Sequence, residues 1–302
     1  MKIIKKHTVT EDIESIVRAA DYIIENCSFF ETKSAVKKAI KKQRILIDGK
    51  ICLTGTHIKK GQIIELLENN NKTGKVFKLK LAVIYEDDFI AVINKPPGIS
   101  VSGNYFKTIQ NTLSFNLKKT NLEDALEIPL PVHRLDNQTS GLLLIAKTRT
   151  ARVNLGKQFE EKNIQKKYNA VVIGTPDKKG IINFPVDGKN ALTRYELVKT
   201  EKSLRNRHLS LINLYPLTGR THQLRIHCKQ SGFPILGDKL YKDDLPVFKG
   251  KGLFLSATEI SFYHPETKKY MNLSIPYPQK FDKIIEKEKQ RYFRKKNNQN
   301  FI

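Results

Sequence analysis

The feature that most constrains the fold of this chain is a polar, charged segment, residues 131–141, that runs directly into an apolar stretch, residues 142–146. The apolar stretch follows a glycine bend and predicts a buried strand. One carboxylate, Asp136, stands shortly before this bend. Because a buried strand is a rigid support, we expect Asp136 to be held at the rim of a pocket. The alternative is that Asp136 only caps a turn and pairs with Arg134.

The overall charge points to a polyanionic partner. The 302 residues include 54 Lys and Arg but only 30 Asp and Glu, which gives a formal net charge of +24. Such an excess produces a positive field that concentrates polyanions and makes their binding salt-dependent. No basic amphipathic helix with a bulky aromatic face indicates a membrane surface instead. We therefore expect the chain to bind nucleic acid, with a merely basic surface as the alternative.

Several other classes of protein are disfavoured. No apolar run is long enough to cross a bilayer and no secretory signal is evident, so a cytoplasmic location is expected. Cys27, Cys52 and Cys228 are far apart and form no CxxC pair, which argues against a zinc site or a disulfide framework. Glycine-rich nucleotide-binding motifs are also missing. We expect no metal and no cofactor, and a monomer by default.

The first part of the chain predicts a small basic domain. Residues 1–10 suggest an edge strand, and apolar spacing predicts a helix from about Thr10 to Ile24. A second helix follows Thr32, a candidate N-cap, with an apolar stripe that faces a core. Asp48-Gly49 predicts a hairpin turn, and residues 59–66 a further turn and strand. Basic residues surround the stripe of the second helix, and either bind phosphates or are simply solvated: Lys37, Lys38, Lys41, Lys42 and Arg44.

The polar, Asn-rich segment 67–75 is the best linker candidate. We accordingly divide the chain into domains 1–74 and 75–302. The second domain opens with a strand pair and a proline-stiffened turn over residues 81–98. Further along, we expect a short helix over 106–120 and a polar loop up to Pro131.

After the Asp136 segment, spacing predicts a helix over 151–159 and a strand over 164–174. Residues 181–215 suggest short β-segments. A turn at 218–220 then leads into a helix whose N-terminal amides and arginines favour an anion. The chain ends in a basic helix that begins near Lys280.

Three motifs in this second domain resemble those of the large pseudouridine synthase family that modifies ribosomal and transfer RNA. They are His133-Arg134-Leu135-Asp136-x-x-Thr139-Ser140-Gly141, Lys167-Tyr168-x-Ala170-Val171 and Thr218-Gly219-Arg220-Thr221-His222-Gln223-Leu224-Arg225. The resemblance implies that Asp136 is catalytic, that Tyr168 packs beneath the target base and contacts Asp136, and that Arg225 pairs with its carboxylate. It also implies that Arg134 fills the space left by a flipped base and that Arg220 holds RNA backbone.

Residues 10–68 resemble the S4-like RNA-binding domain, named after a ribosomal protein, that many members of this family carry at the N-terminus. The whole resemblance implies an α+β fold: a catalytic domain with a mixed, mostly antiparallel sheet and a central cleft, after a small α/β S4-like domain. Ribosomal RNA is the expected partner, and transfer RNA the alternative.

Conversion of uridine to pseudouridine breaks the bond from uracil N1 to the ribose and rejoins the base through C5. The base must first be flipped out of its stack, at a cost of a few kcal/mol. Three routes remain open for Asp136: attack on the anomeric carbon, addition to the uracil ring, or removal of a ribose proton. A non-catalytic RNA-binding or ribosome-assembly factor is the rival function. A base deaminase would need a His-x-Glu and Cys-x-x-Cys zinc motif, which this sequence lacks.

Overall fold

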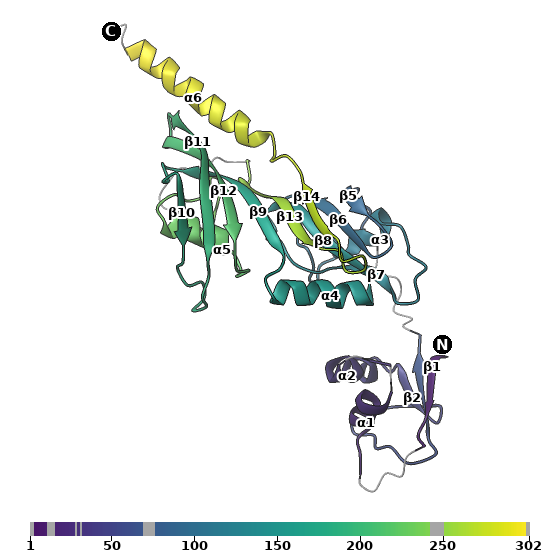
Figure 1. Ribbon diagram of the computed structural model, residues 1–302. Helices are drawn as coiled ribbons and strands as arrows, with labels where there is room; N and C mark the ends of the chain where they lie inside the picture. The colour runs from purple at the N-terminus through teal and green to yellow at the C-terminus, as the bar shows by residue number, and fades with distance from the viewer. Residues whose placement is uncertain are drawn as a thin grey trace. The chain divides into compact units, whose positions relative to one another are not determined.

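A computed structural model describes residues 3–10, 16–27, 29–30, 32–68, 76–241 and 251–299. The chain divides into two compact units, Met1–Gly74 and Lys75–Ile302, drawn in Figure 1. In the described residues, no helix is both long and apolar enough to cross a membrane.

The first unit is a four-stranded antiparallel sheet with two helices. The strands run in the order β1-β4-β2-β3. Apolar side chains from both helices and from the sheet form one core, in which Ile23, Val36, Ile45 and Ile64 are fully buried. The elements are β1 (Ile3–Thr8), α1 (Ala19–Asn26), α2 (Lys33–Lys41), β2 (Ile45–Ile47), β3 (Lys50–Ile51) and β4 (Ile63–Leu67).

Local sequence signals explain α2 and the hairpin that follows it. The side chain of Thr32 caps α2 by accepting a hydrogen bond from the amide of Ala35 at 3.2 Å. Asp48 and Gly49 connect β2 to β3 with φ of 51° and 74°, the positive values of a tight hairpin turn. Both predictions are confirmed.

The predicted start of the first helix is wrong. Helix α1 begins at Ala19, after Arg18 with extended backbone angles, while Ile16 is 84% exposed and Val17 is not helical. Ile16 has the spacing of a buried helical position but contributes nothing to the core. The remaining residues of that prediction, 11–15, lie outside the described part of the chain.

The second unit is built on a ten-stranded sheet. Eight strands follow the order β10-β11-β12-β9-β13-β8-β6-β5, while β14 pairs with β13 and β7 with β8. All pairs are antiparallel except β8 with β13, which confirms a mixed, mostly antiparallel sheet. The strands are β5 (Ala82–Glu86), β6 (Ile90–Lys95), β7 (Ala125–Pro131), β8 (Ser140–Thr148), β9 (Gln165–Ile173), β10 (Lys179–Ile182), β11 (Thr193–Ser203), β12 (Arg207–Pro216), β13 (Leu255–Tyr263) and β14 (Tyr270–Ser274).

Helices cover the sheet at different places (Figure 1). Alternate residues of β8 enter two different cores: Leu143 and Ile145 pack on the side of α5, and Leu142 and Leu144 on the side of α4. The strand is buried on both faces, as its continuous apolar sequence predicts. Helix α6 lies against β11, and its C-terminal end extends beyond the sheet. The helices are α3 (Leu113–Asn116), α4 (Arg149–Glu160), α5 (Gln223–Gln230) and α6 (Lys280–Gln299).

The parallel pairing of β8 with β13 requires the glycine in the Asp136 motif. Gly141 lies opposite Ala257 and has a φ of 113°. A Cβ atom at this position would lie 2.0 Å from the carbonyl oxygen of Ala257. Only glycine can therefore let β13 approach the start of β8, directly after the loop that carries Asp136.

Three predictions for this unit need correction. The segment before Pro131 is not a loop but strand β7, whose pairing with β8 is irregular. The helix expected over 106–120 is reduced to a 3₁₀ turn, Gln110–Thr112, and the single turn of α3. The short β-segments expected over 181–215 include two long paired strands, β11 and β12.

Candidate active site

Asp136 lies in the loop between β7 and β8, and hydrogen bonds from Lys95 hold this loop in place. The Lys95 side chain is fully buried at the end of β6, and its ammonium donates to the carbonyl oxygens of Asn137, Thr139 and Pro96 at 3.1, 2.8 and 2.9 Å. Burial lowers the pKa of Lys95 to about 8, although the negative charge of Asp136 opposes this shift. Two of the three carbonyls lie one and three residues after Asp136, so this cation holds the loop directly after the carboxylate in place.

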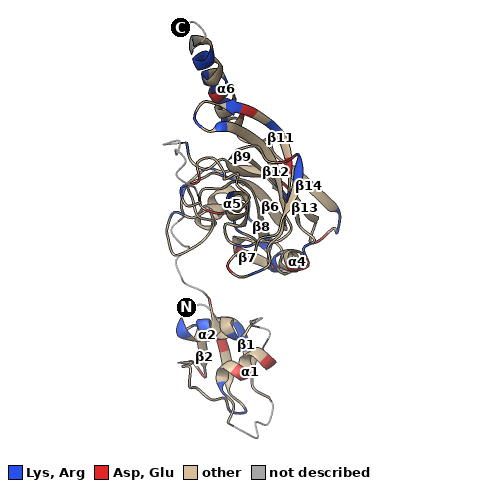
Figure 2. Ribbon diagram, turned by 90° about the vertical axis from the view of Figure 1, so that its left-hand side faces the viewer, with Lys and Arg blue, Asp and Glu red and all other residues tan. Residues whose placement is uncertain are grey.

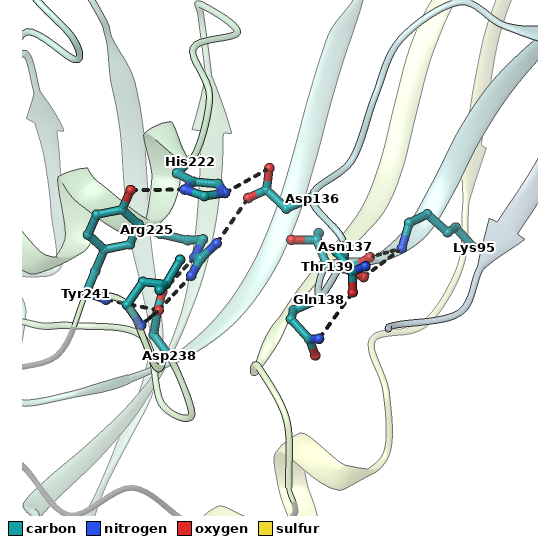
Figure 3. Close-up of polar contacts among 10 residues, drawn as sticks. Lys95, Asp136, Asn137, Gln138, Thr139, His222, Arg225, Asp238 and Tyr241 are labelled. Carbon is teal, nitrogen blue, oxygen red and sulfur yellow. Dashed lines mark hydrogen bonds and ion pairs between the residues drawn. The ribbon is translucent and has the colours of Figure 1, made fainter. Parts of the chain in front are cut away.

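Arg225 and His222 face the Asp136 carboxylate from the start of α5 (Figure 3). Nη1 of Arg225 lies 3.7 Å from Oδ2 of Asp136, and Nε2 of His222 lies 3.9 Å from Oδ1. His222 is the N-cap residue of α5 and has a left-handed backbone, with φ of 56°. The positive end of the helix dipole adds to the positive surroundings of this carboxylate.

Arg225 has a second and closer acidic partner, Asp238. Nε and Nη2 of Arg225 each donate to one carboxylate oxygen of Asp238 at 2.7 Å, in a buried pair. Burial alone would lower the pKa of Arg225, but the hydrogen bonds and negative charge of Asp238 raise it overall. The guanidinium is thus a permanent cation held between two carboxylates (Figure 3).

Tyr168 comes from β9 and packs into the core beside Asp136. Its side chain is buried, in the same cluster as Leu135 and Leu224. Burial raises the pKa of Tyr168, and the negative charge of Asp136 raises it further. The phenol therefore stays protonated at neutral pH and offers an aromatic surface with a neutral hydroxyl.

These side chains surround one cavity of about 300 Å³. Its wall includes Asp136 and Tyr168 together with Arg134, Arg220 and Arg225. A second hollow of about 960 Å³ shares Phe159, Lys166, Thr218 and Arg220 with it and is also lined by Lys162 and Arg194. The carboxylate thus lies in a cavity that adjoins a groove with several cations.

The predicted RNA-binding residues lie in different settings. Arg134 is exposed at the cavity wall, and Nε of Arg220 donates to the carbonyl of Asn190 at 3.1 Å. Figure 2 shows the basic residues of α2, of which Lys37, Lys38 and Lys41 are exposed, as is Lys42 just beyond the helix. Arg44 instead donates to the carbonyl of Leu67 through Nε and Nη2, so part of its hydrogen-bonding capacity serves the fold.

Comparison with known proteins identifies the family of this chain. The sequence profile described as RNA pseudouridylate synthase matches residues 89–230, from β6 to the end of α5. A protein from Rickettsia bellii called ribosomal large subunit pseudouridine synthase C is 35% identical over 285 residues, which cover 84% of this chain and 92% of that protein. The chain belongs to the RNA pseudouridylate synthase family. The cavity with Asp136 is the candidate active site of this pseudouridine synthase.

Other members agree in sequence and fold. An uncharacterised RNA pseudouridine synthase from Aquifex aeolicus is 31% identical over 281 residues, which cover 84% of this chain and 88% of that protein. The solved structure of human RNA pseudouridylate synthase domain containing 4 superposes with a TM-score of 0.55 at 25% identity, over 66% of this chain and 90% of that one.

The geometry shows what this pseudouridine synthase offers to the reaction. The isomerisation breaks the bond between C1′ and N1, forms one between C1′ and C5, moves the proton off C5 and places a proton on N1. Asp136 presents a carboxylate that two cationic or polar side chains flank, next to an aromatic face. Among the described residues, no three His, Cys, Asp or Glu side chains are grouped so that they could hold a metal ion.

The sequence assigned no role to three residues that support the site: Asp238, Tyr241 and Lys95. Asp238 stands 13 positions after Arg225, beyond the end of α5, so no helical spacing connects the pair. Charge balance was the available signal, since a buried arginine requires a carboxylate nearby. Lys95 gave a signal too, because a lysine at the end of an apolar strand must satisfy its ammonium internally.

Proposed function

We propose that this pseudouridine synthase isomerises specific uridines of large-subunit ribosomal RNA. The observation that carries the proposal is the Asp136 carboxylate in a cavity beside Tyr168 and Arg225. The choice of ribosomal RNA rests on similar proteins called ribosomal large subunit pseudouridine synthase C, from Rickettsia and Vibrio, and D, from Buchnera. Transfer RNA is the alternative substrate.

Five cavity residues have proposed roles. Asp136 is the catalytic carboxylate, Arg225 keeps it ionised in a dry site, and Tyr168 stacks beneath the flipped uracil. Arg134 enters the space that the base leaves in the RNA stack. Arg220 and the cations of the adjoining groove, Lys162 and Arg194, hold the flanking phosphates.

The first unit, residues 1–74, is proposed to be an S4-like RNA-binding domain. Lys37, Lys38, Lys41 and Lys42 project from α2 and the residue that follows it, and a sheet supports the helix from behind. Exposed lysines on one short element suit phosphate contacts that do not depend on base sequence. Arg44, two positions after Lys42, completes this basic surface. We place the protein in the cytoplasm, as a monomer that meets its RNA there.

The test maps pseudouridine in total RNA from cells that express the intact chain, no chain, or Asp136→Asn. Chemical labelling that stops reverse transcriptase at each pseudouridine locates every site. We expect one or more sites in large-subunit ribosomal RNA to vanish in both altered strains. Loss of a transfer RNA site alone would transfer the proposal to that substrate, and a site that persists with Asp136→Asn would remove Asp136 from the catalytic role.

A further inference from the structure

One guanidinium lies between two carboxylates, and it is bound more closely by the one farther from the cavity (Figure 3). Arg225 donates to both oxygens of Asp238 at 2.7 Å, but its Nη1 is 3.7 Å from Asp136. The side chains of Arg225 and Asp238 are only 6% and 1% exposed. Buried two-point pairs of this length fix orientation as well as distance. The direction in which Nη1 points therefore depends on Asp238.

Asp238 is itself held by the backbone. Its Oδ1 accepts hydrogen bonds from the amides of Leu240 and Tyr241 at 2.9 and 3.1 Å. The residue before it, Gly237, has a φ of 79°, and a Cβ there would lie 2.0 Å from the carbonyl oxygen of Gly252. The carboxylate is thus part of a tight turn, residues 237–241, and not the end of a mobile side chain.

The same turn also holds the second side chain that faces Asp136. The hydroxyl of Tyr241 bonds Nδ1 of His222 at 2.9 Å, which sets the ring whose Nε2 faces Asp136. The guanidinium carbon of Arg225 lies 5.1 Å from the centre of the Tyr241 ring. Residues 237–241 therefore contact both His222 and Arg225, the two side chains that face the carboxylate of Asp136.

We propose that Asp238 is a positioning residue of the active site, which anchors Arg225 so that one edge of the guanidinium stays directed at Asp136. Tyr241 does the same for His222. The described cavity wall includes His222 and Arg225 but neither Asp238 nor Tyr241, so both act through their partners. Without Asp238, the buried cation would turn to Asp136 as its nearest carboxylate and pull it away from the substrate.

The first test needs no RNA and uses the whole chain. The Nε–H signal of Arg225 in nitrogen-15 NMR, assigned by its loss in Arg225→Lys, reports the pairing directly. We expect a sharp, slowly exchanging signal in the native chain that shifts and broadens in Asp238→Asn. The control is Asp282→Asn, which removes a carboxylate from a partly exposed pair with Lys199 and should leave the signal unchanged. An unchanged signal in Asp238→Asn overturns the proposal.

The second test rests on the proposed function and measures tritium released from ribosomal RNA transcripts made with [5-³H]uridine, because the reaction removes the proton from C5. Asp238→Asn should lower kcat about 10²-fold, as expected for a small displacement of a catalytic group, with KM unchanged. In an Arg225→Lys background, Asp238→Asn should add no further loss, because both changes act through one side chain. Additive losses or a raised KM would indicate a merely structural role and contradict the proposal.

Failure of the substrate proposal and failure of the positioning role of Asp238 give different results. If the native chain releases no tritium from ribosomal RNA, the substrate proposal fails while the NMR signal still decides the role of Asp238. If Asp238→Asn does not fold, Tyr241→Phe removes only one hydroxyl and should still lower kcat at constant KM. A native kcat in Tyr241→Phe would contradict a positioning role for the turn.

Discussion

At the scale of single residues, the site depends on a carboxylate whose position is set by its neighbours. The backbone around Asp136 is bound by Lys95, and its oxygens face Arg225 and His222. Such a group has little freedom to reorganise during the reaction, which is how enzymes gain most from electrostatics. Removing the charge of Asp136 should therefore lower activity far more than removing any neighbouring side chain.

Asp136→Asn is expected to lower kcat roughly 10⁴-fold or more, as removal of a central catalytic group does in other enzymes, while RNA affinity is retained. The amide keeps the size of the carboxylate but cannot act as a base or nucleophile. Tritium release and filter binding with the same RNA measure the two effects. Activity close to that of the native chain would exclude Asp136 as the catalytic residue.

The lowered pKa of Lys95 predicts that activity falls at alkaline pH. Its folded pKa of about 8 is below the usual lysine value, because burial disfavours the charge. As pH rises through 8, the ammonium of Lys95 loses one of its three N–H donors. Three carbonyl oxygens still need a donor, so one of these hydrogen bonds is lost. We expect kcat to fall above about pH 8, measured in single turnovers, with full activity restored when the pH is returned to 7. A flat profile to pH 9 would show that the loop holds without this charge.

At the scale of secondary-structure elements, His133 connects the loop of Asp136 to β8. Its Nε2 accepts a hydrogen bond from the amide of Leu144 at 3.0 Å, which requires a neutral ring. Burial, with a contribution from the charge of Lys166, lowers the pKa of His133 to about 3. Between pH 6.5 and 3 the unfolded chain therefore binds a proton that the folded chain does not, so stability falls as pH falls through this window.

We expect His133→Gln to reduce this acid sensitivity, since an amide oxygen can accept the same bond without titrating. The native chain should lose on the order of 2 kcal/mol between pH 7 and pH 4.5 through this group. Urea unfolding at both pH values in the two chains gives the difference. His57, which is exposed, supplies the matched control His57→Gln, and equal slopes for all three chains would contradict this origin.

The exposed lysines of α2 and Lys42 lead to a prediction about RNA binding that leaves catalysis unchanged. Changing Lys37, Lys38, Lys41 and Lys42 together to Gln should weaken RNA binding and lower the slope of log affinity against log salt by up to about one per lost phosphate contact. At saturating RNA, kcat should remain native. The matched control changes four exposed lysines of the second unit to Gln: Lys118, Lys119, Lys268 and Lys269. Equal effects of the two sets would show a response to net charge only.

The elements also show what sequence reasoning can and cannot supply. The run 142–146 predicted β8 well because a continuous apolar stretch after a glycine has few alternatives. Strand β7 was missed because its prolines disfavour a strand, and it pairs with β8 only irregularly. Asp136, Tyr168 and Arg225 could be brought together by motif resemblance. The contact of Asp238 with Arg225 was not predicted, because it depends on the tight turn of residues 237–241 and not on sequence spacing.

At the scale of the whole molecule, the two units have separate cores. Fully buried side chains of the first unit, such as Ile64, cluster only with residues of that unit, and those of the second form clusters of their own. Ile64→Ala should destabilise the first unit by about 2–5 kcal/mol. Calorimetry should then show one transition moved to lower temperature and the other unchanged, whereas a shift of both would indicate cooperative unfolding.

The approach of Gly141 to Ala257 has a consequence for protein synthesis. The hydroxyls of Ser140 and Ser256, which lie beside that contact, are bonded across 116 positions of sequence. A ribosome therefore completes Asp136 long before it makes the strand that secures the start of β8. Until that late strand emerges, the start of β8, directly after the loop of the proposed catalytic carboxylate, lacks the pairing with β13. We therefore expect the chain to gain activity only when its synthesis is almost complete, beside the class of RNA that we propose as its substrate.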